Sequence, residues 1–216
     1  MKDLATLLNA YCEAHTSPQP PTLYELERET HLKTLAPQML SGHLQGQFLS
    51  LLSKLHRPKL ILEIGTFTGY SAICLAQGLQ EGGRLHTIEA NAELEYLIRK
   101  YVAKAGLEQR ITLHIGDALE IIPSLEGPFD MVFIDAGKQD YIRYYDMVAG
   151  NLNPGGLIIA DNVLWDGKVV NEGRDQDPDA RSLHEFNEMV QRDPSVENIM
   201  LPVRDGLLVV RKLGET

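Results

Sequence analysis

Cysteine is scarce in this chain. Only Cys12 and Cys74 occur among 216 residues, and they do not form a CxxC pair. A zinc site built from thiolates is therefore excluded. Two isolated cysteines are typical of reduced thiols in a cytoplasmic protein, and we expect that location.

Long apolar runs and positive charge are also lacking. No segment approaches the roughly 18 apolar residues of a membrane-spanning helix. Residues 1–15 hold one lysine and no extended apolar stretch, so a secretory signal and a membrane partner are not expected. The chain has 20 Lys and Arg residues and 30 Asp and Glu residues, which gives a net charge of −10. This charge disfavours binding of nucleic acid through a broad basic surface.

The chain does contain an alternation of short apolar runs with helical patterns after residue 56. We interpret residues 1–216 as one domain, with a helical region at 1–56 and an α/β core at 57–216. The helical patterns of the core are Tyr70–Gln80, Ala92–Ala105, Asp117–Ile122, Tyr141–Leu152 and Ala180–Gln191. The apolar runs are Leu60–Ile64, Arg84–Glu89, Ile111–Ile115, Phe129–Asp135, Leu157–Asp161, Asn198–Val203 and Leu207–Lys212.

The first five runs are almost continuously apolar, as expected for strands that are buried on both faces. Alternation with helices predicts a mostly parallel sheet with helices on both faces. Only residues 204–206 separate the last two runs, which predicts an antiparallel hairpin at the C-terminus. The sequence thus predicts an α/β fold with a seven-stranded, Rossmann-like sheet.

Residues that end the first three strands match an adenosine-shaped ligand. Gly65 and Gly69 allow a tight turn into a helix whose free N–H groups can face a carboxylate. Glu89 can accept from both ribose hydroxyls, and Asp117 from an exocyclic amine. Phe67 stands where dinucleotide-binding proteins have the second glycine of GxGxxG, which disfavours NAD. The glycine turn taken alone also fits a strand–helix turn without a ligand.

Two further strand ends carry oxygen ligands. Asp135 follows the fourth run, and Asp161 and Asn162 end the fifth. If these strands are neighbours, the three side chains converge at one edge of the sheet. Carboxylate and amide oxygens suit Mg²⁺, Ca²⁺ or Mn²⁺. Each motif alone also fits an ordinary helix cap or turn.

Several motifs in the same order resemble the cation-dependent O-methyltransferases of the caffeoyl-CoA and catechol type, which are class I S-adenosylmethionine-dependent enzymes. The resemblance covers nearly the whole chain. The motifs are residues 39–42 (MLSG), 44–46 (LQG), 63–71 (EIGTFTGYS), 116–118 (GDA), 133–136 (FIDA), Lys138, 161–165 (DNVLW) and 205–207 (DGL).

This resemblance implies a small catechol-like aromatic substrate, S-adenosylmethionine, a divalent cation and a homodimer. It implies that Asp135, Asp161 and Asn162 hold the metal and that Lys138 is the general base. One departure concerns Gly137, where many plant enzymes have Asp, which puts a plant-like substrate preference in doubt. The expected cofactor-binding residues are Met39, Ser41, Glu63, Gly65, Phe67, Ser71, Glu89, Asp117, Ala118 and Asp135.

The implied chemistry is metal-assisted methyl transfer. A phenol with a pKa of about 10 is a poor nucleophile near neutral pH, and a bound cation stabilises its phenolate. Lys138 can accept the proton. Trp165 could stack on the acceptor or only pack its loop. His43 is expected to be structural rather than part of the acceptor site.

Three other functions stay open at this stage. A methyltransferase of the same family could act on a hydroxylated tRNA base, although the acidic composition disfavours it. A nicotinamide dehydrogenase is disfavoured by Phe67. A non-catalytic module that binds S-adenosylmethionine is disfavoured by Lys138 and the oxygen ligands.

Overall fold

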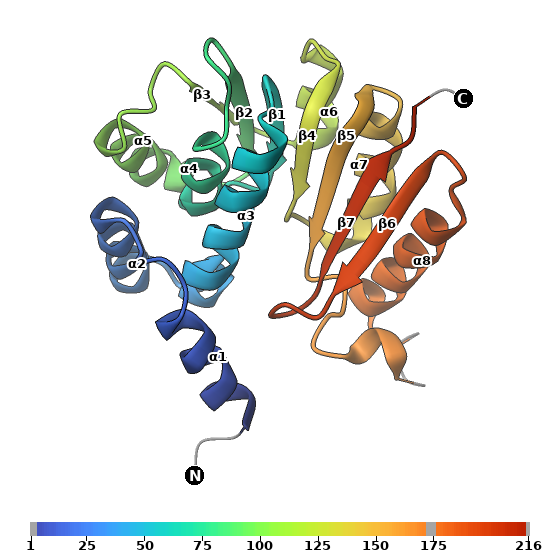
Figure 1. The fold of residues 1–216 in the computed structure, drawn as a ribbon, viewed down its shortest axis with the longest axis horizontal. Coiled ribbons are helices and arrows are strands. Elements are labelled where there is room, and N and C mark those ends of the chain that lie inside the picture. Colours follow the sequence, from blue (N-terminus) through green and yellow to red (C-terminus); the bar gives the residue numbers. More distant parts are fainter. Residues whose placement is uncertain (1–3, 172–175, 215–216) are drawn as a thin grey trace.

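The computed structural model describes residues 4–171 and 176–214, and seven strands of these segments form one sheet. The strand order is β3-β2-β1-β4-β5-β7-β6 (Figure 1). The five neighbouring strands β3, β2, β1, β4 and β5 are parallel, and β7 pairs antiparallel with both β5 and β6. The predicted fold is confirmed, hairpin included. The strands are β1 (Leu60–Ile64), β2 (Arg84–Glu89), β3 (Ile111–Ile115), β4 (Phe129–Ile134), β5 (Leu152–Asp161), β6 (Val196–Leu201) and β7 (Leu207–Lys212).

Two strand boundaries differ clearly from the prediction. Strand β5 begins at Leu152, five residues before the apolar run, because Leu152 pairs with Phe129 across an irregular register. Its first part is polar and glycine-rich, so the apolar pattern did not reveal it. Strand β6 is Val196–Leu201 and stops before Pro202, which has no N–H to donate to a ladder.

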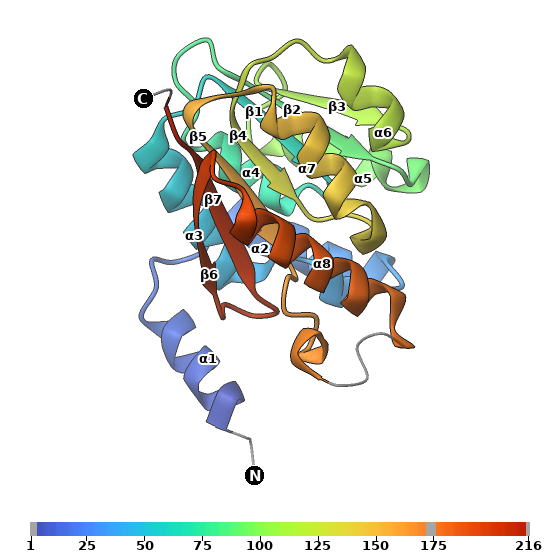
Figure 2. The same cartoon turned by 90° about the vertical axis from the view of Figure 1, so that its right-hand side faces the viewer.

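Helices cover both faces of the sheet (Figures 1 and 2). One buried cluster contains residues of α3, α4 and α5, and a second contains residues of α6, α7 and α8. Several helices are shorter than predicted; α4 ends before Gly78, where a Cβ would lie 2.1 Å from the Ser53 carbonyl carbon. The helices are α1 (Leu4–Ala14), α2 (Pro21–Lys33), α3 (Gly42–His56), α4 (Tyr70–Ala76), α5 (Glu95–Lys104), α6 (Ala118–Ile121), α7 (Tyr141–Ala149) and α8 (Pro178–Arg192).

The N-terminal helices differ in how firmly they are packed. Helix α3 lies against α4, where a Cβ on Gly46 would meet the Tyr70 ring at 2.5 Å. Helix α1 extends away from the rest of the molecule (Figure 2), and Leu4, Leu7 and Tyr11 on it are exposed. Within the described segments, no helix has the length and apolar character of a membrane span.

The ends of the parallel strands are joined side by side by backbone hydrogen bonds. The N–H of Gly116 donates to Glu89 O at 2.9 Å, and that of Gly65 to Ile88 O at 3.0 Å. The N–H of Asp135 donates to Ile64 O at 2.8 Å. This edge, where α/β proteins bind ligands, therefore carries most of the predicted site residues.

Candidate active site

Gly65 is required by packing as well as by the turn. Its φ is +95°, and a Cβ there would lie 1.9 Å from the carbonyl oxygen of Asp135. Phe67 also has a positive φ, +51°, and packs against the buried cluster of α3 to α5. The glycine turn after β1 thus lies directly against the start of the loop that carries Asp135 and Lys138.

Glu89 anchors this turn. Its Oε2 accepts from the Phe67 N–H at 2.7 Å, and its Oε1 accepts from the Asn91 N–H at 2.8 Å. Each carboxylate oxygen has a second lone pair. Glu89 is therefore fixed in direction, and each of its oxygens keeps a lone pair for a further donor.

Glu63 is fully buried at the end of β1. Its Oε2 accepts from the Thr87 hydroxyl at 2.5 Å, whereas Oε1 is buried without a hydrogen-bond partner. Burial raises the pKa of Glu63 to about 8, and the charges of Asp135 and Glu89 act in the same direction. A buried acceptor without a donor is costly, so the structure fits a ligand donor such as an ammonium group at this position.

Glu63→Gln should stabilise the ligand-free protein increasingly as the pH rises. A carboxyl group whose pKa is raised on folding favours the folded state at low pH. That contribution is lost between the unfolded pKa of 4.5 and the folded value of about 8. At about 1.4 kcal/mol per pKa unit, the gain in unfolding free energy at pH 8.5 over pH 5.5 should be a few kcal/mol.

Urea unfolding at the two pH values measures this difference. Glu197→Gln, at an exposed position of β6, is the control and should show no such trend. An equal effect of Glu63→Gln at both pH values would contradict the pKa shift.

The remaining predicted cofactor residues differ in burial and local role. Ser71 is buried at the start of α4, and Ser41 is buried just before α3, whereas Met39 is exposed. Asp117 is the N-cap of α6, where its carboxylate accepts from the Leu119 N–H at 2.9 Å, and Ala118 is buried beside it. Asp117 therefore has a structural role, which does not prevent it from contacting adenine.

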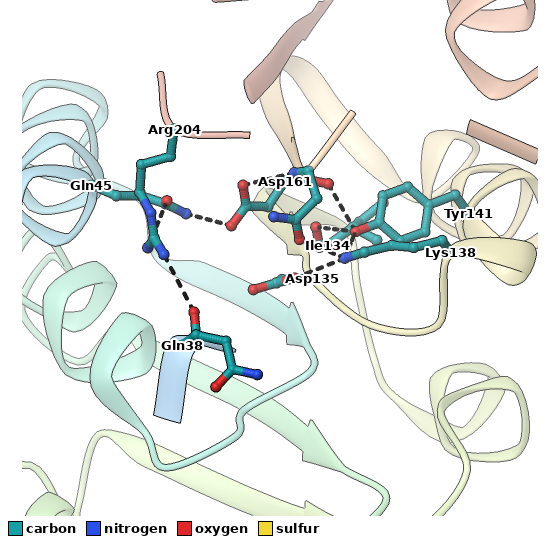
Figure 3. A network of polar contacts seen from close by, with 9 residues as sticks. Gln38, Gln45, Ile134, Asp135, Lys138, Tyr141, Asp161 and Arg204 are labelled. Atoms are coloured by element: carbon teal, nitrogen blue, oxygen red, sulfur yellow. Dashed lines mark hydrogen bonds and ion pairs between the residues drawn. The ribbon is translucent and has the colours of Figure 1, made fainter. Parts of the chain in front are cut away.

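Asp135 and Asp161 lie at the ends of β4 and β5 (Figure 3). Together with Asn162, whose N–H donates to Asp161 Oδ1 at 2.7 Å, they form the Asp–Asp–Asn cluster. The Lys138 ammonium lies between two of them. Its Nζ donates to Asp135 Oδ1 at 3.0 Å and to Asn162 Oδ1 at 2.7 Å. Asn162 has a φ of +58°, a conformation that asparagine adopts more readily than most residues. The structure thus places the predicted metal ligands and the predicted base together.

The donor set of this cluster fits a hard divalent cation. Burial raises the pKa of Asp161 to about 6, and the nearby charge of Asp135 adds to the shift, so the two carboxylates are close enough to repel each other. A cation between them would relieve that repulsion. In the described part of the chain, no three His, Cys, Asp or Glu side chains form a metal-binding group, and the third oxygen of this cluster belongs to the Asn162 amide.

Two residues of this site were given no role from the sequence, although Gln45 lies in the LQG motif of residues 44–46. The buried Tyr141 hydroxyl accepts from Lys138 Nζ at 2.8 Å and donates to the Asp161 carbonyl at 3.0 Å. Burial raises the pKa of Tyr141 well above its usual value, so it stays neutral. Its spacing of three residues from Lys138 was an available signal. The second is Gln45, which contacts Asp161 from α3; no spacing in the sequence indicated this contact.

Trp165 and His43 are also placed. Trp165 packs against the buried cluster of α6 to α8, and its Nε1 donates to Asp177 Oδ2 at 3.4 Å. Its ring centroid is 6.0 Å from Lys138 Nζ, so it lies beside the candidate site as well. The Nε2 atom of His43 lies 2.7 Å from the carbonyl oxygen of Ser17, which is a structural contact.

Comparisons with known proteins agree with this arrangement. The model of a family described as O-methyltransferase matches residues 13–213. A catechol O-methyltransferase of Niastella koreensis is 40% identical over 73% of this chain and 72% of its own. A caffeoyl-CoA O-methyltransferase of Populus trichocarpa is 34% identical over 93% of this chain and 86% of its own.

Solved structures agree as well. An O-methyltransferase of Bacillus cereus in complex with SAH has a TM-score of 0.88 at 32% identity, covering 95% of this chain and 97% of that one. The SAH-bound Podospora anserina methyltransferase has a TM-score of 0.89 at 29% identity, covering 97% and 95%. With the fold and the strand-end residues already described, these matches show that the chain is an enzyme of the O-methyltransferase family, among the class I S-adenosylmethionine-dependent methyltransferases.

Proposed function

We propose that this enzyme transfers the methyl group of S-adenosylmethionine to a hydroxyl of a small, catechol-like aromatic, with a divalent cation bound by the Asp–Asp–Asn cluster. The observation that carries the proposal is the position of Lys138 Nζ, within 3.0 Å of both Asp135 Oδ1 and Asn162 Oδ1. A basic group, two carboxylates and an amide therefore meet beside the glycine turn. The names of the catechol and caffeoyl-CoA O-methyltransferases point to the same substrate class.

The residues of the chain divide the work as follows. Glu63, Gly65 and Glu89 bind and orient the methyl donor, together with Met39, Ser41, Phe67, Ser71, Asp117, Ala118 and Asp135. When bound, a cation such as Mg²⁺, Ca²⁺ or Mn²⁺ stabilises a phenolate against the usual phenol pKa of about 10.

In the proposed step the neutral amine of Lys138 takes the phenolic proton at Nζ and becomes the ammonium, and the Tyr141 hydroxyl, 2.8 Å away, holds that nitrogen in place. Trp165 and Tyr141 line one side of the Lys138 ammonium, with ring centroids at 6.0 and 5.0 Å. Correct placement of the two reacting atoms supplies much of the rate enhancement.

We also propose that the enzyme works in the cytoplasm as a homodimer. The exposed apolar side chains of α1, among them Leu4, Leu7 and Leu8, offer a surface that a second copy or the acceptor could cover. The oligomeric state can be measured by light scattering.

Removal of divalent cations is expected to abolish turnover. The assay is methyl transfer from S-adenosylmethionine to caffeic acid, with Mg²⁺ and again with EDTA. Loss of a cation that stabilises the phenolate should lower the rate by at least about 100-fold, since such stabilisation amounts to several kcal/mol. Excess Mg²⁺ added back should restore activity, which controls for damage by EDTA.

Full turnover in EDTA would contradict the role of the cation. If the protein binds S-adenosylmethionine but leaves catechols unmethylated, the proposed acceptor is wrong. Hydroxylated tRNA is then the next acceptor to test, with salt-sensitive binding as its signature.

A further inference from the structure

Gln45 reaches the Asp–Asp–Asn cluster from the first turn of α3. Its side chain is only 1% exposed, and Nε2 donates to Asp161 Oδ2 at 2.5 Å (Figure 3). A buried amide is unfavourable unless its hydrogen bonds are made, so its presence here calls for a reason. The contact joins α3 to the end of β5 across 116 positions of the chain.

The contact completes the orientation of the Asp161 carboxylate. Oδ1 accepts from the Asn162 N–H at 2.7 Å, and Oδ2 accepts from Gln45, so donors hold both oxygens. A carboxamide is neutral and never gains a positive charge. Gln45 can therefore fix the direction of the carboxylate without neutralising it, and each oxygen keeps a lone pair for a cation.

Arg204 determines which end of the Gln45 amide faces Asp161. Its Nη1 donates to Gln45 Oε1 at 3.4 Å and to the Leu40 carbonyl at 2.8 Å, and it also donates to the Ser41 carbonyl. A guanidinium group only donates, so it selects the oxygen of the amide and leaves the NH₂ for Asp161. Figure 3 shows Arg204, Gln45 and Asp161 in this order.

We propose that Gln45 is a positioning residue for the site of the divalent cation. The Gln45 amide orients the Asp161 carboxylate toward the Asp–Asp–Asn cluster, and Arg204 sets the direction of that amide. This inference rests on the proposed function, because it needs a cation at that site. It concerns side chains that hydrogen-bond to a metal ligand. Loss of such a side chain typically weakens metal binding or activity by about 10–100-fold.

The test measures Mn²⁺ binding to the full chain by electron paramagnetic resonance, in the absence of a methyl acceptor. Gln45→Leu keeps the volume and removes the amide, and it should weaken Mn²⁺ binding by about 10–100-fold. Its affinity for S-adenosylhomocysteine, measured by calorimetry, should change less than about twofold. A merely structural role for Gln45 would instead lower both affinities and the melting temperature together, and that result would overturn the inference.

Gln47→Leu is the matched control. It is the same substitution two residues further along α3, and residues two apart do not share a helix face. Its Mn²⁺ affinity should equal that of the wild type. If Gln45→Leu does not fold, Gln45→Asn keeps the amide but withdraws it by one methylene, and it should also weaken Mn²⁺ binding.

Failure of this inference can be told from failure of the proposed function. Wild-type protein that binds no Mn²⁺, or Asp161→Asn protein that binds it as well as wild type, would contradict the proposed cation site itself. Wild-type affinity in a folded Gln45→Leu or Gln45→Asn variant, with binding lost in Asp161→Asn, would overturn only the role of Gln45.

Discussion

Lys138→Met is expected to lower kcat by about 10²–10⁴-fold, the usual contribution of a general base. Methionine is similar in length and apolar, so it can occupy the space beside the Tyr141 and Trp165 rings without accepting a proton. Binding of S-adenosylmethionine should change little, because Glu63 and Glu89 lie on β1 and β2, whereas Lys138 lies after β4.

Single-turnover assays with bound methyl donor measure this effect separately from binding. Lys54→Met, at an exposed position of α3, is the control and should retain full activity. A Lys138→Met enzyme with wild-type kcat would exclude Lys138 as the base and leave the cation alone to activate the hydroxyl.

Gly65→Ala is expected to destabilise the fold and abolish binding of the methyl donor. An alanine Cβ would lie 1.9 Å from the Asp135 carbonyl oxygen, in a backbone conformation with φ of +95° that already disfavours side chains. Relief requires β1 and β4 to separate at the edge where the site is formed. The loss should be on the order of 3 kcal/mol, since backbone strain and overpacking each cost about 1–3 kcal/mol.

Gly82→Ala separates the cost of backbone strain from the cost of the contact with Asp135. Gly82 has a φ of +70°, but nothing lies within 4 Å of its added Cβ. It should cost only about 1–2 kcal/mol, the penalty of a left-handed conformation. Denaturant unfolding compares the two variants, and calorimetry with S-adenosylhomocysteine measures donor binding. Equal costs for both variants would mean that the contact with Asp135 is unimportant.

The contrast between Gly65 and Gln45 explains how far the sequence could predict this site. Gly65 was predicted from a local pattern, a glycine directly after an apolar strand, although packing against Asp135 proved to be a second reason for it. Gln45 belongs to the LQG motif, but its contact was not predicted, because its partner Asp161 is 116 positions away. Tyr141 is intermediate, since its distance of one helical turn from Lys138 could have been noticed.

The same distinction applies to the fold. Continuous apolar runs predicted buried parallel strands, because a strand covered on both faces needs apolar side chains on both. The start of β5 was missed because its first residues are polar, and pairing with Phe129 rather than hydropathy makes them a strand.

The sequence by itself determined the family, the class of fold, the strand-end residues and the types of ligand they suit, because each is written in short segments of the chain. Only the tertiary structure decided which of these residues meet. It brought Lys138 between Asp135 and Asn162, and it placed Gln45 and Arg204 behind Asp161. Contacts between distant segments depend on how helices and strands pack, and that packing sums many small interactions along the whole chain.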